Sequence, residues 1–151
     1  MKKDYLERCS ISLINFKILI VVLMMSKQVT IKYQSIILNQ DNNKEKVVYN
    51  GIGFLTENNS FKELAFNLEA NNLVKLKFSK EKVNLKYQEN NFKLILNKSI
   101  KNKYHTMYGQ LDLNIFLKSY EETNNQLKMV YELSQNNEFI SKIYLIIYFT
   151  T

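Results

Sequence analysis

The residues that could carry out covalent chemistry are few and lie far apart in this 151-residue chain. His105 is the only histidine and Cys9 is the only cysteine. Nucleophilic catalysis needs a nucleophile, a base and an orienting acid in register, and neither a nucleophile elbow nor a Cys-His signature is present. The residue alternation also places His105 on the opposite strand face from Tyr104 and Thr106. The sequence therefore predicts no catalytic residue and favours a structural or solvated histidine, which leaves an enzyme as the third interpretation.

Metal and nucleotide sites are excluded on similar grounds. One cysteine permits neither a Cys-based zinc site nor an internal disulfide, which fits a reducing compartment, and one histidine excludes multi-histidine metal sites. Gly51-Ile52-Gly53 lacks the rest of a phosphate-cradling loop and lies inside a strand pattern. We therefore expect no metal and no cofactor, and we expect the two glycines to serve a curved strand.

Three hydroxyl groups could instead serve non-covalent binding. Tyr104, Thr106 and Tyr108 occupy alternate positions and would share one face of a strand. If that face lines a lumen, the hydroxyls would offer hydrogen bonds inside an apolar barrel, as in many small-molecule sites. The alternative is a polar belt whose hydrogen bonds are satisfied by neighbouring strands.

Lysine carries almost all of the formal net charge of +7, and Arg8 is the single arginine. Lys75, Lys77, Lys82 and Lys86 interleave with aromatic and aliphatic residues, a composition that single-strand nucleic-acid binders also use. The alternation places the aromatic residues on the opposite face, which favours a solvated lysine face. A chain rich in Asn, Lys and Ile also fits AT-rich codons. A weak nucleic-acid contact stays open.

From Val29 onward, short runs of alternating apolar and polar residues are separated by asparagine turns, a pattern typical of antiparallel hairpins. The stretch 104–117 is expected to form one long strand bent at Gly109, with Leu111, Leu113 and Ile115 on its buried face. The predicted strands cover 29–34, 47–55, 74–78, 83–87, 92–96, 104–117, 127–133 and 138–150.

Two segments do not fit this pattern simply. Ser60-Phe61-Lys62-Glu63 resembles a helix capping box, although residues 64–68 alternate equally well as a strand. Residues 1–25 form an N-terminal extension that ends in an apolar run, 18–25, too short to span a bilayer. This extension is expected to be sequence upstream of a natural start at Met25, a signal or membrane anchor, or a short packed helix. The first reading implies a cytoplasmic protein, and the second an anchored or exported one.

Several motifs resemble those of the YwiB-like family, an uncharacterised group of small bacterial proteins. The resemblance rests on Tyr104-x-Thr106-x-Tyr108-Gly109, on residues 129–133 and on Ile52-Gly53-Phe54, and it extends over roughly residues 29–150. It implies a calycin-like, lipocalin-type barrel, and it implies that residues 60–69 form a strand ending in Glu69. The Arg-Ser-Gly turn of that family is replaced here by residues 87–91, so no role of that arginine is carried over.

These observations predict an all-β protein: one antiparallel calycin-like barrel, residues 26–151, of about eight to ten strands. A barrel of that size either is filled by side chains or holds one small ligand. We expect non-catalytic binding of a small apolar or amphipathic molecule, with Tyr104, Thr106, Tyr108 and Glu69 as candidate lining residues. The alternative is a protein- or RNA-binding module that uses the lysine-rich exterior. The sequence does not indicate an oligomeric state.

Overall fold

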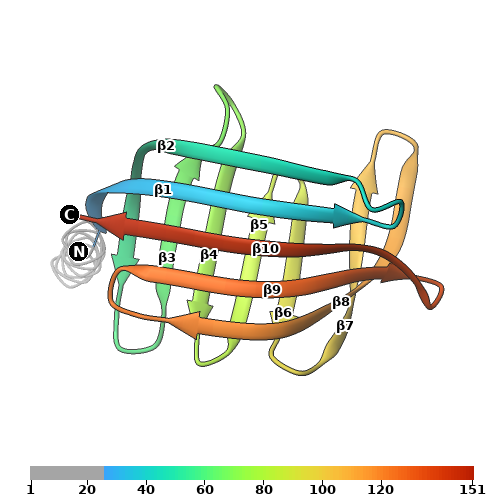
Figure 1. Ribbon diagram of the computed structural model, residues 1–151. Helices are drawn as coiled ribbons and strands as arrows, with labels where there is room; N and C mark the ends of the chain where they lie inside the picture. Colours follow the sequence, from blue (N-terminus) through green and yellow to red (C-terminus); the bar gives the residue numbers. More distant parts are fainter. Residues whose placement is uncertain (1–25) are drawn as a thin grey trace, which may run out of the picture.

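The computed structural model describes residues 26–151, so the predictions for residues 1–25, including Cys9, lie outside the described residues. Ten strands account for nearly all of the described chain (Figure 1). They are β1 (Ser26–Asn39), β2 (Lys44–Glu57), β3 (Lys62–Asn67), β4 (Leu73–Ser79), β5 (Lys82–Tyr87), β6 (Asn90–Ile95), β7 (Ser99–Thr106), β8 (Gly109–Glu122), β9 (Gln126–Gln135) and β10 (Glu138–Thr150).

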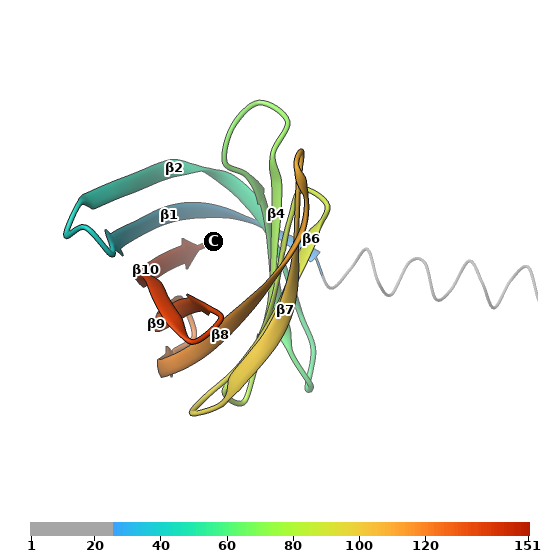
Figure 2. The same ribbon diagram turned by 90° about the vertical axis from the view of Figure 1, so that its right-hand side faces the viewer.

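All ten strands form one antiparallel sheet in the order β6-β5-β4-β3-β2-β1-β10-β9-β8-β7. The long strands β1, β2, β9 and β10 make one layer, and the shorter strands β3 to β7 cross behind it at a steep angle (Figures 1 and 2). The two edge strands, β6 and β7, come back together, which nearly closes the sheet into a barrel. The prediction of an all-β barrel is confirmed.

The core follows the alternation of the sequence. Inward-facing positions of nine strands supply one continuous cluster of buried apolar side chains, among them Ile31, Leu64, Phe78, Leu117 and Ile147. Side chains at alternate strand positions point to opposite sheet faces, so a period-two sequence buries one face and solvates the other. Leu113 and Ile115 are buried as predicted, whereas Leu111 is 42% exposed.

β2 passes from one layer to the other and bends where its glycines lie. It pairs with β1 over Lys44–Thr56 but with β3 only over Phe54–Glu57. A Cβ at Gly51 would meet the Tyr49 ring, and a Cβ at Gly53 would stand 2.7 Å from the backbone oxygen of Ala65. The close approach of these groups requires glycine, so Gly51 and Gly53 belong to a corner of the barrel.

Residues 62–67 form strand β3, as the family resemblance implies, and the local helix signal is wrong. The Asn58 side chain accepts hydrogen bonds from the backbone N–H groups of Ser60 and Phe61, an arrangement that a helix start could also use. The strand forms because residues 62–67 pair with β4 on one side and with β2 on the other, which no local signal contains. Lys62 and Glu63 then pair across to β4 instead of beginning a helix.

The stretch 104–117 is a hairpin and not the single bent strand that we expected. β7 ends at Thr106, Met107 and Tyr108 form the turn, and β8 starts at Gly109, which has a φ of +124°. Thr106 pairs with Gly109 across the turn, and its Oγ1 donates to the Gly109 carbonyl oxygen. Glycine is used here because that backbone conformation is strained for any residue with a Cβ.

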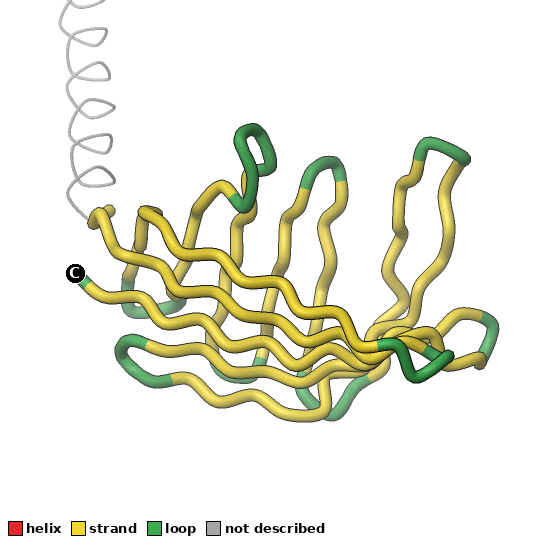
Figure 3. The backbone as a smooth tube through the Cα atoms, turned by 45° about the horizontal axis from the view of Figure 1, so that its top comes forward, coloured by secondary structure: helices red, strands yellow, loops and turns green. Residues whose placement is uncertain are grey.

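Most asparagine turns lie where the sequence predicts them (Figure 3). Asn136 and Asn137 both have positive φ in the two-residue loop between β9 and β10, which is the geometry of a type I′ turn. Asn90 is the exception, because it is not a turn residue but the buried first residue of β6. The turn before it is made by Gln88, whose φ is 54°, and Glu89.

Candidate ligand-binding cavity

An apolar cavity of about 530 Å³ lies between the two layers. Seven strands contribute to its wall, namely β1, β5, β6, β7, β8, β9 and β10. Its apolar lining consists of Ile37, Leu85, Phe92, Leu94, Leu111, Leu113, Ile115, Leu133, Ile140 and Ile143. This volume and this composition lie within the range of small-molecule sites in proteins.

One wall of the cavity is positioned by β8 and by the contact between the edge strands β6 and β7, which we call the seam. Leu111, Leu113 and Ile115 are consecutive inward positions of β8, and Leu111 is the most exposed of the three. The rings of Phe92 on β6 and Tyr104 on β7 lie 5.9 Å apart, centroid to centroid. Aromatic rings at this distance attract each other, so the pair joins the two edge strands directly over the cavity.

The polar lining groups are Tyr87, Tyr104, Tyr131, Gln135 and Ser141. Burial, with a smaller contribution from Tyr33, raises the pKa of the Tyr131 hydroxyl above its usual value. Tyr131 therefore stays a neutral hydrogen-bond donor at physiological pH. The lining offers hydroxyl and amide groups but no charged side chain, so the cavity suits a molecule with a large apolar part and a neutral polar group.

Two buried asparagine side chains take the place of a backbone ladder between β6 and β7. Asn102 Oδ1 accepts from the Lys93 N–H at 2.7 Å, and its Nδ2 donates to the Lys93 carbonyl at 3.0 Å. Asn90 does the same for His105, at 2.7 Å and 3.3 Å. A buried backbone group without a partner is costly, so these amides satisfy the backbone where the two strands are too far apart to pair directly.

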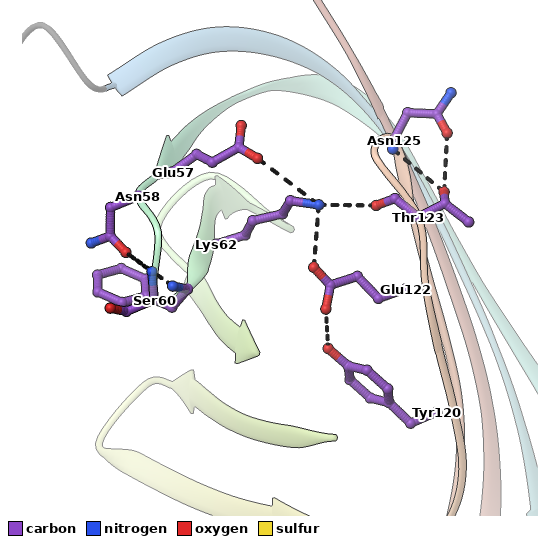
Figure 4. A network of polar contacts seen from close by, with 9 residues as sticks. Glu57, Asn58, Ser60, Lys62, Tyr120, Glu122, Thr123 and Asn125 are labelled. Carbon is purple, nitrogen blue, oxygen red and sulfur yellow. Dashed lines mark hydrogen bonds and ion pairs between the residues drawn. The ribbon is translucent and has the colours of Figure 1, made fainter. Parts of the chain in front are cut away.

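A polar network lies at the opposite end of the barrel, where β2 and β8 end and β3 begins (Figure 4). The Lys62 ammonium group lies 3.2 Å from Glu122, 4.0 Å from Glu57 and 3.1 Å from the Thr123 carbonyl oxygen. Glu122 in turn accepts a hydrogen bond from the Tyr120 hydroxyl. Because Lys62 is mostly buried, its several partners offset the loss of hydration. The cavity is thus confined to the end away from this network.

The four predicted lining residues are not brought together. Tyr104 lines the cavity. The Thr106 hydroxyl donates its hydrogen bond within the β7–β8 turn, to the Gly109 carbonyl oxygen. Tyr108 lies at the tip of that hairpin and is 93% exposed. Glu69 follows the end of β3 in an exposed turn, where its carboxylate accepts a hydrogen bond from the Asn72 side chain. Thr106, Tyr108 and Glu69 therefore lie outside this cavity.

The sequence did not lead us to most of the residues that line the cavity, nor to Asn90 and Asn102, which bridge β6 and β7. Tyr131 and Leu133 were placed on one strand face by their alternation with Val130 and Glu132, and this signal could have added them to the candidates. Asn102 carried a weaker signal, because a polar residue at an inward strand position needs a specific partner.

Residues 26–151 contain no cluster of three or more metal-ligating side chains. His105 is exposed and contributes its backbone, not its ring, to the seam. In the same part of the chain, no helix has the length and hydropathy needed to cross a membrane.

Comparison with known proteins identifies the family. The chain is similar to the crystal structure of the ywiB protein from Bacillus subtilis, with a TM-score of 0.64 and 17% sequence identity over 84% of this chain and 94% of that one. At this identity the likeness shows the fold. No curated protein matches. The family model described as domain of unknown function (DUF1934) matches residues 29–147, so the chain belongs to this DUF1934 family.

Proposed function

We propose that the barrel is a non-catalytic binding protein for a small apolar or amphipathic molecule, and that the cavity is the binding site. The observation that carries the proposal is the cavity itself, about 530 Å³ with ten apolar residues among the fifteen that line it. Burial of apolar ligand surface there would supply about 25 cal/mol for each Å² removed from water.

The family resemblance implies a calycin-like, lipocalin-type barrel, and a barrel of that kind would hold one small ligand, in agreement with the proposal. The neutral polar lining restricts the ligand further. Tyr131, Ser141 and Gln135 could bind a hydroxyl, carbonyl or amide group, but no lining side chain would pair with a charge. Long-chain alcohols, amides and protonated fatty acids fit this description.

The test combines native mass spectrometry with a dye. Protein purified without detergent is expected to retain an apolar molecule, and the stripped protein is expected to bind the uncharged dye Nile red with enhanced fluorescence. Leu111→Trp places an indole at the cavity wall and should weaken dye binding by about tenfold, roughly the loss of 1.4 kcal/mol.

Val48→Trp is the matched control, because it adds the same indole at an exposed position of β2. This variant should bind the dye within about twofold of the wild type. Equal dye binding by the wild type and by Leu111→Trp would contradict the proposal, as would a wild-type protein that retains no molecule and binds no dye.

A further inference from the structure

The outer face of β4, β5 and β6 carries a dense lysine cluster, which we call the lysine face: Lys75, Lys77, Lys82, Lys86 and Lys93. These are five of the ten outward positions of the three strands. The other five are Leu73, Ser79, Asn84, Asn91 and Ile95, so none is acidic. This surface lies on the far side of the β4–β6 wall from the cavity and is independent of it.

Composition alone does not account for this clustering. The eleven outward positions of β1 and β10, at even numbers from 28 to 38 and from 142 to 150, include only Lys32 and Lys142. A general excess of lysine would have spread over both faces of the barrel. Instead the outer side of β1 and β10 carries tyrosine, isoleucine and threonine, and the charge gathers on β4 to β6.

The lysines of this face have one acidic neighbour, Glu63, which is the direct cross-strand partner of Lys77. Of the five ion pairs among the described residues, none involves a member of the lysine face. Lys75 and Lys86 are also direct cross-strand partners, an arrangement in which like charges repel and destabilise the sheet. Glu63 is the one carboxylate in the shallow groove beside Lys75, Lys77 and Lys86. With five lysines on this face and one carboxylate beside them in the groove, most of the positive charge of the face is uncompensated.

We propose that the lysine face binds the phosphate backbone of a nucleic acid without reading its bases. Adjacent strands place neighbouring lysines about 5 Å apart, and residues two apart on a strand lie about 7 Å apart, which presents several cations to one polyanion. Asn84 and Asn91 lie between the lysines and offer amide donors of the kind that also contact phosphate. The ten outward positions hold no aromatic residue on which a base could stack, and the nearby Phe61 ring is covered by the Lys77 ammonium group, 3.8 Å from its centroid.

An anionic membrane is the less suitable partner for this face. Proteins that bind membrane surfaces combine cations with apolar side chains that enter the acyl boundary. The centre of the lysine face carries only lysine and asparagine, and Leu73 and Ile95 lie at its margins.

Fluorescence anisotropy with a labelled DNA duplex and a labelled single-stranded RNA, from 25 to 300 mM salt (roughly a tenfold range), tests the proposal. About four phosphate contacts predict a slope of log K against log salt near −3.6 for the duplex. The triple variant Lys75→Gln/Lys86→Gln/Lys93→Gln should weaken binding at least about tenfold at low salt and reduce the slope by two to three units.

The matched control is Lys32→Gln/Lys44→Gln/Lys46→Gln, which removes the same charge from exposed positions of β1 and β2. It should change affinity less than about threefold. Three results would overturn the proposal: equal losses in the two triple variants, no binding to either nucleic acid at 25 mM salt, or binding to phosphatidylserine vesicles in the absence of nucleic-acid binding.

Discussion

Asn102 is the residue on which closure of the barrel most directly depends. Its side chain is 5% exposed and makes both hydrogen bonds to the Lys93 backbone, with a third bond to the Ile100 carbonyl oxygen at 3.1 Å. Asn102→Ala would leave the N–H and C=O groups of Lys93 without these partners. Each buried group left unsatisfied costs about 1–3 kcal/mol, so urea denaturation should show a loss of roughly 2–4 kcal/mol.

Asn84→Ala is the matched control, since Asn84 is exposed on the outer face of β5 and should change stability by less than about 0.5 kcal/mol. Hydrogen exchange should also show faster exchange of the Lys93 amide in Asn102→Ala but not in Asn84→Ala. If the two variants were equally stable, the side-chain bridge would not be holding the seam.

At this scale the sequence shows which face a side chain takes but not what it contacts. Alternation puts Tyr104, Thr106 and Tyr108 on one strand face, but only Tyr104 lines the cavity, because the turn at Met107 and Tyr108 interrupts the strand. Asn90 was read as a turn residue because asparagine is common in turns, and only the spatial return of β7 to β6 reveals its bonds to His105. Partners 12 or more residues apart depend on how the sheet closes, which no local pattern contains.

At the scale of the elements, the turn of the β4–β5 hairpin contains two residues that are unfavourable for its backbone conformation. Lys80 and Glu81 have φ values of 45° and 67° in a two-residue loop, a geometry that favours Asn-Gly. Lys80→Asn/Glu81→Gly leaves the net charge unchanged and removes the steric cost of a Cβ at positive φ. Thermal or urea unfolding should show a gain of about 1 kcal/mol.

The equivalent change at the β9–β10 hairpin provides the comparison. Asn137→Gly alters a turn of the same length, but asparagine already tolerates its φ of 64°, so the gain should be only a few tenths of a kcal/mol, roughly. An equal gain at both turns would argue that loss of the Cβ, and not relief of an unfavourable residue, sets the effect.

Turn chemistry also explains which elements could be predicted. Asparagine pairs marked several loops correctly, and the alternation then gave the strands between them. The β7–β8 turn was missed because Met107 and Tyr108 are not turn residues and the alternating pattern continues on both sides of them. β3 was disputed because its capping signal is local, whereas its pairing with β4 is not.

On the scale of the whole molecule, the two ends of the barrel differ. One end carries the Lys62 network, and the other holds the cavity between the layers. Seven strands line that cavity, so its existence depends on the curvature of the complete sheet. The sequence predicts which side chains point inward, but it does not show which part of the interior they fail to fill.

The closed barrel also predicts how the protein responds to alkaline pH. Burial raises the pKa of Tyr33, Tyr120 and Tyr131 above the usual value, and at Tyr120 the hydrogen bond to Glu122 and nearby negative charge add to the effect. In the unfolded chain these phenols have the usual tyrosine pKa of about 10. The folded state then holds protons that the unfolded state has lost, so this contribution to stability is complete below that pH and declines above it.

Urea unfolding followed at several pH values from 8 upward should therefore show a stability that declines above about pH 10, with one tyrosine contributing roughly 1.4 kcal/mol per pH unit. Tyr131→Phe removes one such group and should make the decline shallower. Absorbance at about 295 nm should show that part of the tyrosine ionisation coincides with unfolding, because the raised pKa values of these three phenols are lost when the barrel unfolds. Ionisation of every tyrosine near its usual pKa in a protein that remains folded would mean that water already reaches the interior, and it would contradict a barrel whose edges are sealed by Asn90 and Asn102.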